Sequence, residues 1–230
     1  MRKKYLYALI ILIILAEGFY FSMNNISLDL IKISRSGVAK ETEQIIFVLA
    51  NKFNKAKLFL CEKDHDGNWI KKLDAYAFVG KNGIGETNEG TAKTPVGIYN
   101  FTHAFGIEKN PGIKSFDYIQ VDDSYYWVDD VNSSYYNKFV STKEKNIKKD
   151  WNSAEHIIDF SPQYKYVMAF DYNKECVPGA GSAFFLHVKG GEKYTLGCVS
   201  VPEKIMIEIM KQIKRNCKMV ICYQNQMLNY

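Results

Sequence analysis

The chain of 230 residues contains few of the residue types that build metal centres and disulfide frameworks. It has four histidines, five cysteines and five prolines. No CxxC pair occurs. Cys176, His187 and Cys198 are separated by intervals of about ten residues, without the short paired spacing typical of zinc ligands. The sequence therefore predicts neither a metal site nor a bound cofactor.

Repeats, low-complexity tracts and dense basic patches are also missing. The net charge is +5, from 30 Lys and Arg against 25 Asp and Glu, and the two signs are interspersed along the chain. This mild charge does not predict a nucleic-acid partner. A hydrophobic content of 47%, with 16 Tyr and 14 Phe, instead indicates a globular protein with a sizeable core.

The N-terminus carries a targeting signal. "MRKK" is followed by an almost unbroken apolar run from Leu6 to Ala16, which is shorter than the roughly 20 residues of a membrane-spanning helix. The run fits the apolar region of a secretory signal, although "AEG" at 16–18 only loosely resembles a cleavage site. We therefore expect export to the cell envelope, outside the cytoplasm, with residues 1–22 acting as a signal peptide or as an N-terminal membrane anchor.

The cysteine count leaves the redox state open. Cysteines stand at positions 61, 176, 198, 217 and 222, and an exported protein can form disulfides. Because five is an odd number, at least one thiol is left over in a monomer. The spacing does not determine which of the others pair.

The rest of the chain is predicted to be a linker, residues 23–43, followed by one mainly β domain with a few helices, residues 44–230. Residues 80–97 hold five glycines among polar residues and predict a loop. A short helix is possible within residues 143–157. Apolar or alternating runs predict strands at 44–50, 56–62, 69–80, 98–106, 117–130, 164–173, 182–188 and 217–223.

The strongest helical signal covers residues 201–215. Ser200 and Glu203 match a capping box, with Ser200 as the N-cap residue. Apolar residues recur on one face of this predicted helix, at Ile205, Met206, Ile209, Met210 and Ile213.

Cys198 and His187 are the candidate catalytic pair. Cys198 precedes the predicted helix, whose positive end would lower the pKa of the thiol, and Gly197 beside it allows close approach of the backbone. His187 lies on the predicted strand at 182–188, where Phe185 and His187 share one face. A thiol beside an imidazole base is the minimum for nucleophilic attack on a carbonyl. The simpler alternative is a buried cysteine and a hydrogen-bonded core histidine.

Four stretches resemble the L,D-transpeptidase family of cell-wall enzymes, in the order expected for that family. They read "VGKNGIGETNEGTAKTPVGIYNFTHAFG", "YWVDDVNSSYYNKFV", "SAEHIIDFSPQYKYVMAFDYN" and "GSAFFLHV…TLGCVSV". The familiar motif has His or Ser shortly before Gly-Cys, whereas Leu196 stands there in this chain. The interval from His187 to Cys198 is also shorter than in many members, so the resemblance is to a divergent branch.

This resemblance implies a single L,D-transpeptidase-like β-sandwich domain and a set of roles. Cys198 would be the nucleophile, and His187 would be the general base and then the acid. The backbone N–H groups of Gly197 and Cys198 would hold the oxyanion, and a carbonyl of Gly190 or Gly191 would orient the imidazole. The substrate would be a peptidoglycan tetrapeptide stem, joined to a second stem by a 3-3 crosslink. Water as acceptor would instead make the protein an L,D-carboxypeptidase, and neither reaction needs a metal or a cofactor.

Other residues carry weaker hypotheses. His103 could line the substrate cleft, although a structural role is the simpler interpretation, and His156 is expected to pack among helical residues. Gly179, Gly181 and Ser182 could border the cleft or form an ordinary turn.

Two further functions remain open. A non-catalytic module on the same scaffold would bind peptidoglycan stems and would have no chemical need for the Cys and His pair. A sortase-like or papain-like enzyme would need an Arg or an Asn/Asp partner, for which the sequence offers no convincing candidate. If the N-terminal segment is not cleaved, the membrane is a further partner.

Overall fold

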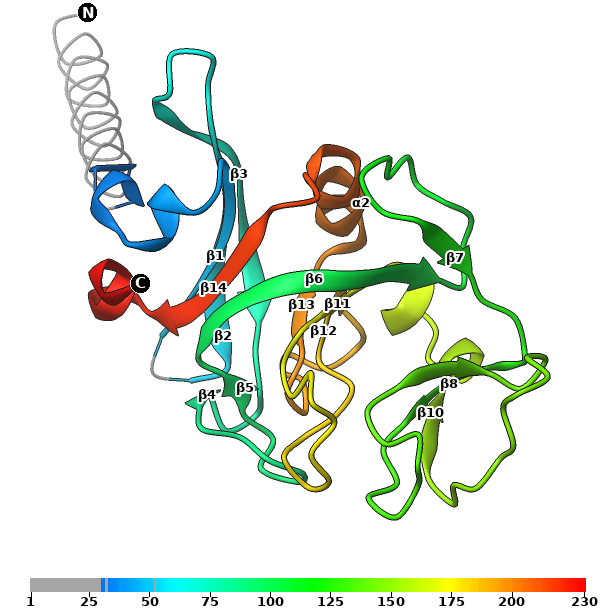
Figure 1. Cartoon of the computed structure of the whole chain (residues 1–230). Coiled ribbons are helices and arrows are strands. Elements are labelled where there is room, and N and C mark those ends of the chain that lie inside the picture. Colours follow the sequence, from blue (N-terminus) through cyan, green and yellow to red (C-terminus); the bar gives the residue numbers. More distant parts are fainter. Residues whose placement is uncertain (1–29, 32, 52) are drawn as a thin grey trace, which may run out of the picture.

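The structure, a computed structural model, describes residues 30, 31, 33–51 and 53–230 (Figure 1). The predicted signal peptide or anchor at residues 1–22 lies outside this part. Within the described residues, no helix has the length and apolar character needed to cross a membrane.

The described residues form one main sheet that closes on itself. Its order is β11-β12-β13-β3-β2-β1-β14-β6-β7, and β11 also pairs with β6, so that all of these strands except β7 form a barrel-like ring. The strands are β1 (Gln44–Ala50), β2 (Lys55–Lys63), β3 (Trp69–Phe78), β6 (Gly97–Gly106), β7 (Tyr118–Gln120), β11 (Val167–Phe170), β12 (Phe185–Val188), β13 (Val199–Val201) and β14 (Lys218–Tyr223).

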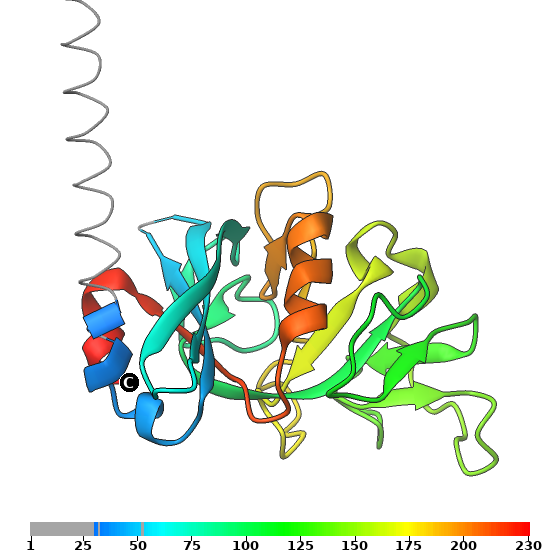
Figure 2. The ribbon, with the colours of Figure 1, turned by 90° about the horizontal axis from the view of Figure 1, so that it is seen from above.

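A second, smaller sheet lies beside this ring, on the side away from the C-terminus (Figures 1 and 2). It has the order β10-β8-β9, with β8 at Tyr125–Val128, β9 at Phe139–Ser141 and β10 at Ala154–His156. A short parallel pair, β4 (Ile84–Gly85) and β5 (Thr94–Pro95), lies in the predicted glycine-rich loop.

Several strands are buried on both faces. In β1, Ile46 and Val48 face the main core, and Ile45 and Phe47 face a second core on the outside of the ring. This explains why β1 reads as a continuous apolar run rather than as an alternating one. The second core includes Ile33, so the packed body of the protein extends into the predicted linker.

The predicted helix exists but is shorter than expected. The helix α2 runs from Glu203 to Gln212, and Pro202 is its N-cap residue without a side-chain capping bond. The prediction of Ser200 as N-cap is therefore wrong. Val199 and Val201 are buried and β-branched, and this segment pairs with β12 as strand β13 instead. The predicted apolar face of the helix packs into the main core.

The aromatic stretch at 117–130 divides into β7 and β8, which do not pair with each other. β7 pairs in parallel with β6, whereas β8 pairs with β9 and β10. The possible helix at 143–157 is wrong, because this stretch forms turns and then β10. The short 3-10 helices are η1 (Val38–Lys40), η2 (Ile157–Asp159), η3 (Gln163–Lys165) and η4 (Gln224–Asn229).

The expected fold class, mainly β with a few helices, is confirmed in the described residues. The sheet arrangement differs from a simple sandwich of two open sheets, because β6 and β11 pair and close the larger sheet. A third core lies between this ring and the small sheet, with Phe105 and Phe185 contributing from the ring and Trp127 from β8. The candidate site opens beside this third core.

Candidate active site

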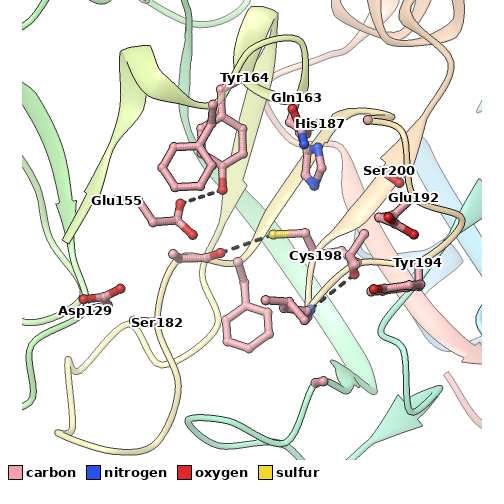
Figure 3. A pocket seen from close by; sticks show the side chains of 18 of the residues that line it. Asp129, Glu155, Gln163, Tyr164, Ser182, His187, Glu192, Tyr194, Cys198 and Ser200 are labelled. Atoms are coloured by element: carbon pink, nitrogen blue, oxygen red, sulfur yellow. Dashed lines mark hydrogen bonds between the residues drawn. The ribbon is translucent and has the colours of Figure 1, made fainter. Parts of the chain in front are cut away.

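A cavity of about 560 Å³ lies between the end of β12, the turn before β13 and the small sheet (Figure 3). The structure places both Cys198 and His187 on its wall, although they are 11 positions apart in the sequence. The other chemically reactive side chains on this wall include Glu89, Asp129, Glu155 and Tyr164.

His187 is held as a neutral base. It lies on β12, as predicted, and its side chain shares the outer face with Phe185, while Leu186 and Val188 point into the main core. Its Nδ1 atom lies 2.8 Å from the carbonyl oxygen of Val188. Because a carbonyl only accepts hydrogen bonds, Nδ1 carries the proton and Nε2 is free to accept one. Burial lowers the pKa of His187 to about 4.

The carbonyl that orients this imidazole is therefore that of Val188, and not that of Gly190 or Gly191 as predicted. The carbonyl of Gly190 accepts a hydrogen bond from Lys189 Nζ at 2.7 Å instead. The reason is local, because the carbonyl of Val188, the next residue along β12, already lies within hydrogen-bond distance of the His187 ring.

Cys198 is partly exposed to the cavity, but its sulfur is held by the backbone on one side. The thiol donates to the carbonyl of Ala183 at 3.2 Å and accepts from the N–H of Phe185 at 3.3 Å. Burial raises the pKa of Cys198 far above its ordinary value, and the nearby carboxylate of Glu155 raises it further. The predicted lowering of this pKa is wrong, because the cysteine precedes a strand and not a helix. Cys198 is therefore a protonated thiol in this structure.

The turn before Cys198 is fixed by two buried threonines. Thr195 Oγ1 accepts from the N–H of Gly197 at 3.2 Å and donates to the carbonyl of Cys198 at 2.6 Å. Thr94 donates to the same carbonyl at 3.0 Å. The N–H of Gly197, predicted to face an oxyanion, is therefore engaged with Thr195 in this structure.

Gly197 has a different structural requirement. A Cβ atom at this position would lie 2.6 Å from the ring of Phe184, so a side chain there would displace this ring from the edge of the cavity.

Sequence reasoning missed the pair formed by Glu155 and Tyr164. Tyr164 on η3 donates from its hydroxyl to Glu155 Oε2 at 2.5 Å, and its ring packs edge-on against His187 with centroids 5.5 Å apart. Burial raises the pKa of Glu155 to about 7. Both residues lie in one of the stretches that carry the family resemblance. Nothing in a single sequence distinguishes them from ordinary surface and core residues.

Asn137 is a second residue that sequence reasoning missed. Its Oδ1 accepts from Trp127 Nε1 at 2.9 Å and from the N–H of Ala183 at 3.2 Å. Its Nδ2 donates to the carbonyl of Asn173 at 2.9 Å. Ala183 has the left-handed φ of +56°, which is unusual for a residue with a side chain, and its carbonyl is the one that accepts from Cys198.

The two other histidines considered in the sequence analysis, His103 and His156, do not line the cavity of Cys198. His103 lines a second cavity of about 410 Å³, together with Cys176, and not the cavity of Cys198. His156 lies on β10 and not on a helix, and it stacks on Tyr126 with ring centroids 4.5 Å apart. It also bonds to Asp159 at 2.8 Å.

Of the three residues predicted to border the cleft, Ser182 does so, and its hydroxyl donates to Glu89 at 2.8 Å. Gly181 and Gly179 lie in the turn that precedes it, both with positive φ. Cys176, Cys198, Cys217 and Cys222 carry free thiols. Across the described ranges, no group of three or more His, Cys, Asp or Glu side chains is arranged to hold a metal ion.

Comparison with known proteins gives structural neighbours of low sequence identity. No family profile and no curated protein matches the sequence. A mutant of the L,D-transpeptidase of Enterococcus faecium has 12% identity and a TM-score of 0.37, with 79% of this chain and 50% of that chain covered. The helical cell shape determining protein Pgp2 from Campylobacter jejuni has 15% identity and a TM-score of 0.40, with coverage of 79% and 48%. The chain spans about half the length of each.

Proposed function

We propose that this protein is an exported cysteine L,D-transpeptidase that acts on peptidoglycan tetrapeptide stems. The observation that carries this proposal is the cavity in which a neutral imidazole with a free Nε2 accompanies a cysteine thiol. The ordered resemblance of four sequence stretches to this family supplies the substrate class. Residues 1–22 would direct the chain out of the cytoplasm, either as a cleaved signal or as an anchor.

Acylation would begin when the Cys198 S–H turns from the carbonyl of Ala183 toward His187. His187 accepts the proton at Nε2 while the sulfur attacks the carbonyl of the third stem residue. The N–H of Phe185, which already contacts the sulfur, stabilises the thiolate as it forms. The C–N bond then breaks, a thioester forms, and His187 returns the proton to the departing D-Ala.

Deacylation would reverse the roles. The side-chain amine of a second stem attacks the thioester and loses its proton to His187, and the thiol of Cys198 recovers that proton when the new amide forms. The N–H of Cys198 would stabilise the oxyanion in both halves. The N–H of Gly197 would join it once released from Thr195.

The same site also supports an L,D-carboxypeptidase, in which water replaces the amine. The partly open cavity favours neither acceptor by itself. A non-catalytic peptidoglycan-binding module remains the third candidate.

Mass spectrometry of the products separates these three functions. The purified protein is incubated with a disaccharide-tetrapeptide, in parallel with the Cys198→Ala variant. A crosslinked dimer that lacks one D-Ala, absent with the variant, supports transpeptidation, and a shortened monomer supports the carboxypeptidase. Retention on peptidoglycan without any Cys198-dependent product would overturn both enzymatic functions and favour the binding module.

A further inference from the structure

The cavity around Cys198 has the opposite charge to the protein as a whole. The chain has a net charge of +5, yet the residues that line this cavity include four carboxylates and no Lys or Arg. His187 adds no positive charge, because burial keeps its imidazole neutral. The four carboxyl groups are those of Glu89, Asp129, Glu155 and Glu192, and Glu155, whose pKa is raised to about 7, carries its full charge only above that pH. A ligand that carries a cation is therefore favoured over an anionic one.

One of these carboxylates lacks a hydrogen-bond donor. The Oδ1 atom of Asp129 is buried and has no partner among the described residues. By contrast, Tyr164 satisfies Glu155 Oε2, and Tyr136 and Ser182 both donate to Glu89 Oε1. An unpaired buried acceptor is destabilising, so a donor supplied by a ligand would remove a penalty that the free protein carries.

The position of Glu155 links this charge to the nucleophile. In the view of Figure 3, Glu155 and Asp129 lie on one side of the Cys198 sulfur and His187 lies on the other. Glu155 is close enough to Cys198 to oppose the formation of a thiolate, and Tyr164 holds it in that place. A cation bound against Glu155 would cancel this opposition, because two neighbouring negative charges repel each other and an intervening positive charge attracts both.

We propose that Glu155 and Asp129 bind the ammonium group of the donor substrate, and that this ammonium activates Cys198 by neutralising the charge of Glu155. The donor is the substrate concerned, because the thiol must be activated before acylation. This inference rests on the proposed function only in taking Cys198 as the nucleophile. It adds that donors with an ammonium group near the attacked carbonyl react faster than neutral or acidic ones.

The test uses small thiol reagents of opposite charge, with a smaller neutral reagent beside them. Full-length protein in a Cys176→Ser background is treated with aminoethyl, methyl and sulfonatoethyl methanethiosulfonate, and peptide mapping by mass spectrometry gives the rate at Cys198. Each rate is divided by that of N-acetylcysteine with the same reagent, which removes the intrinsic reactivity. We expect the normalised rate of the cationic reagent to exceed that of the anionic reagent about tenfold or more.

Matched variants assign this preference. Glu155→Gln should bring the normalised ratio close to one, and Asp129→Asn should lower it. Glu144→Gln, which removes an exposed carboxylate elsewhere, should leave it unchanged. Circular dichroism confirms that each variant is folded, and Asp129→Asn serves as the second test if Glu155→Gln does not fold. A cationic-to-anionic rate ratio near one in the parent protein would overturn the proposal. So would a ratio in Glu155→Gln and Asp129→Asn that is unchanged from the parent.

A substrate experiment connects the charge preference with catalysis. Acetylation of the side-chain amine of the third stem residue should slow acylation of Cys198 in the parent protein, measured as adduct formed in a single turnover so that no acceptor amine is needed, and should slow it much less in Glu155→Gln. An equal loss in both proteins would contradict the assignment of Glu155. Because the reagent rates need no peptide, a charge preference without any D-Ala release would support the cation site at Glu155 and Asp129, while the proposed function and the assignment of the cation to a stem donor would fail.

Discussion

Cys198 and His187 each lie in surroundings that favour the uncharged form, for different reasons. The imidazole is enclosed by protein, with Val188 accepting from Nδ1, and the thiol is enclosed and also faces the carboxylate of Glu155. The pair therefore starts as a thiol and an imidazole and not as a thiolate and an imidazolium. In the proposed reaction, proton transfer would therefore belong to the acylation step, and substrate binding could control it.

Glu155 and His187 should make stability depend on pH in opposite directions. The pKa of Glu155 is raised from 4.5 to about 7. Its contribution to the free energy of unfolding is therefore complete below pH 4.5 and is lost as pH rises through 7. The pKa of His187 is lowered from 6.5 to about 4. Its contribution to the free energy of unfolding is therefore present above pH 6.5 and is lost as pH falls through 4.

The Glu155→Gln variant isolates the first of these effects. In this variant the part of the pH dependence that comes from Glu155 should be absent. As the pH rises from 4.5 to 7, the free energy of unfolding should therefore fall less, or rise more, in the variant than in the parent. Urea denaturation at several pH values measures both curves. Parallel curves for parent and variant across this range would contradict the burial argument for Glu155.

At the scale of elements, the segment that carries Cys198 is a strand and not a helix start. Ser200 and Glu203 match a capping box in sequence, but the alternation Val199-Ser200-Val201 matches a buried strand equally well. Pairing with β12, which places Ser200 opposite His187, decides between them. A local motif cannot reveal such a pairing, because it depends on a second segment of the chain.

Ser200→Ala tests this assignment. An N-cap serine contributes about 1 kcal/mol to stability, whereas Ser200 makes no capping bond here. We expect the substitution to change the free energy of unfolding by less than about 0.5 kcal/mol in urea denaturation. A loss of 1 kcal/mol or more would restore the capping role.

Asn137 should be important for the stability of the segment that holds the sulfur. Asn137→Ala would leave Trp127 Nε1 and the N–H of Ala183 without an acceptor, at a cost of about 1–3 kcal/mol. Asn137 also has a φ of +56°, so Asn137→Gly should be the less harmful variant, by about 1 kcal/mol. Chemical denaturation of the two variants checks both differences. Equal stability of Asn137→Ala and the parent would show that these bonds are dispensable.

Several elements could be predicted from the sequence because their signal is local. The strands at 44–50 and 98–106, and the orientation of Phe185 and His187 on β12, follow from apolar runs and from period-2 alternation. The closure of the ring could not be predicted, since β6 and β11 pair across more than 60 residues of sequence. The pairing of Glu155 with Tyr164 depends on the same long-range placement of the small sheet beside the ring.

At the scale of the whole molecule, the packed body extends beyond the predicted domain boundary at residue 44. Ile33 is 1% exposed and contributes to the second core, and the N–H of Val38 donates to the carbonyl of Tyr230 at 2.7 Å. The two ends of the described chain therefore support one another on the outer face of β1 and β14, on the other side of the ring from the small sheet (Figure 2).

Ile33→Ala tests this extension. Truncation of a fully buried aliphatic side chain costs about 2–5 kcal/mol, so the variant should unfold at clearly lower urea concentration. Phe53→Ala is the control, because Phe53 is 73% exposed and its truncation should change stability by less than about 0.5 kcal/mol. If Ile33→Ala were as stable as the control, residues before 44 would be a linker as first predicted.

At this scale, the fold places a cysteine thiol and an imidazole at one cavity between two sheets, and the central claim of the proposed function is that this thiol becomes acylated. The most direct measurement is the intact mass of the protein after brief incubation with a disaccharide-tetrapeptide and acid quenching. We predict a mass increase equal to the stem without its terminal D-Ala, on the peptide that contains Cys198, and none in Cys198→Ala. The same adduct in Cys198→Ala, or D-Ala release by that variant at the parent rate, would contradict the account.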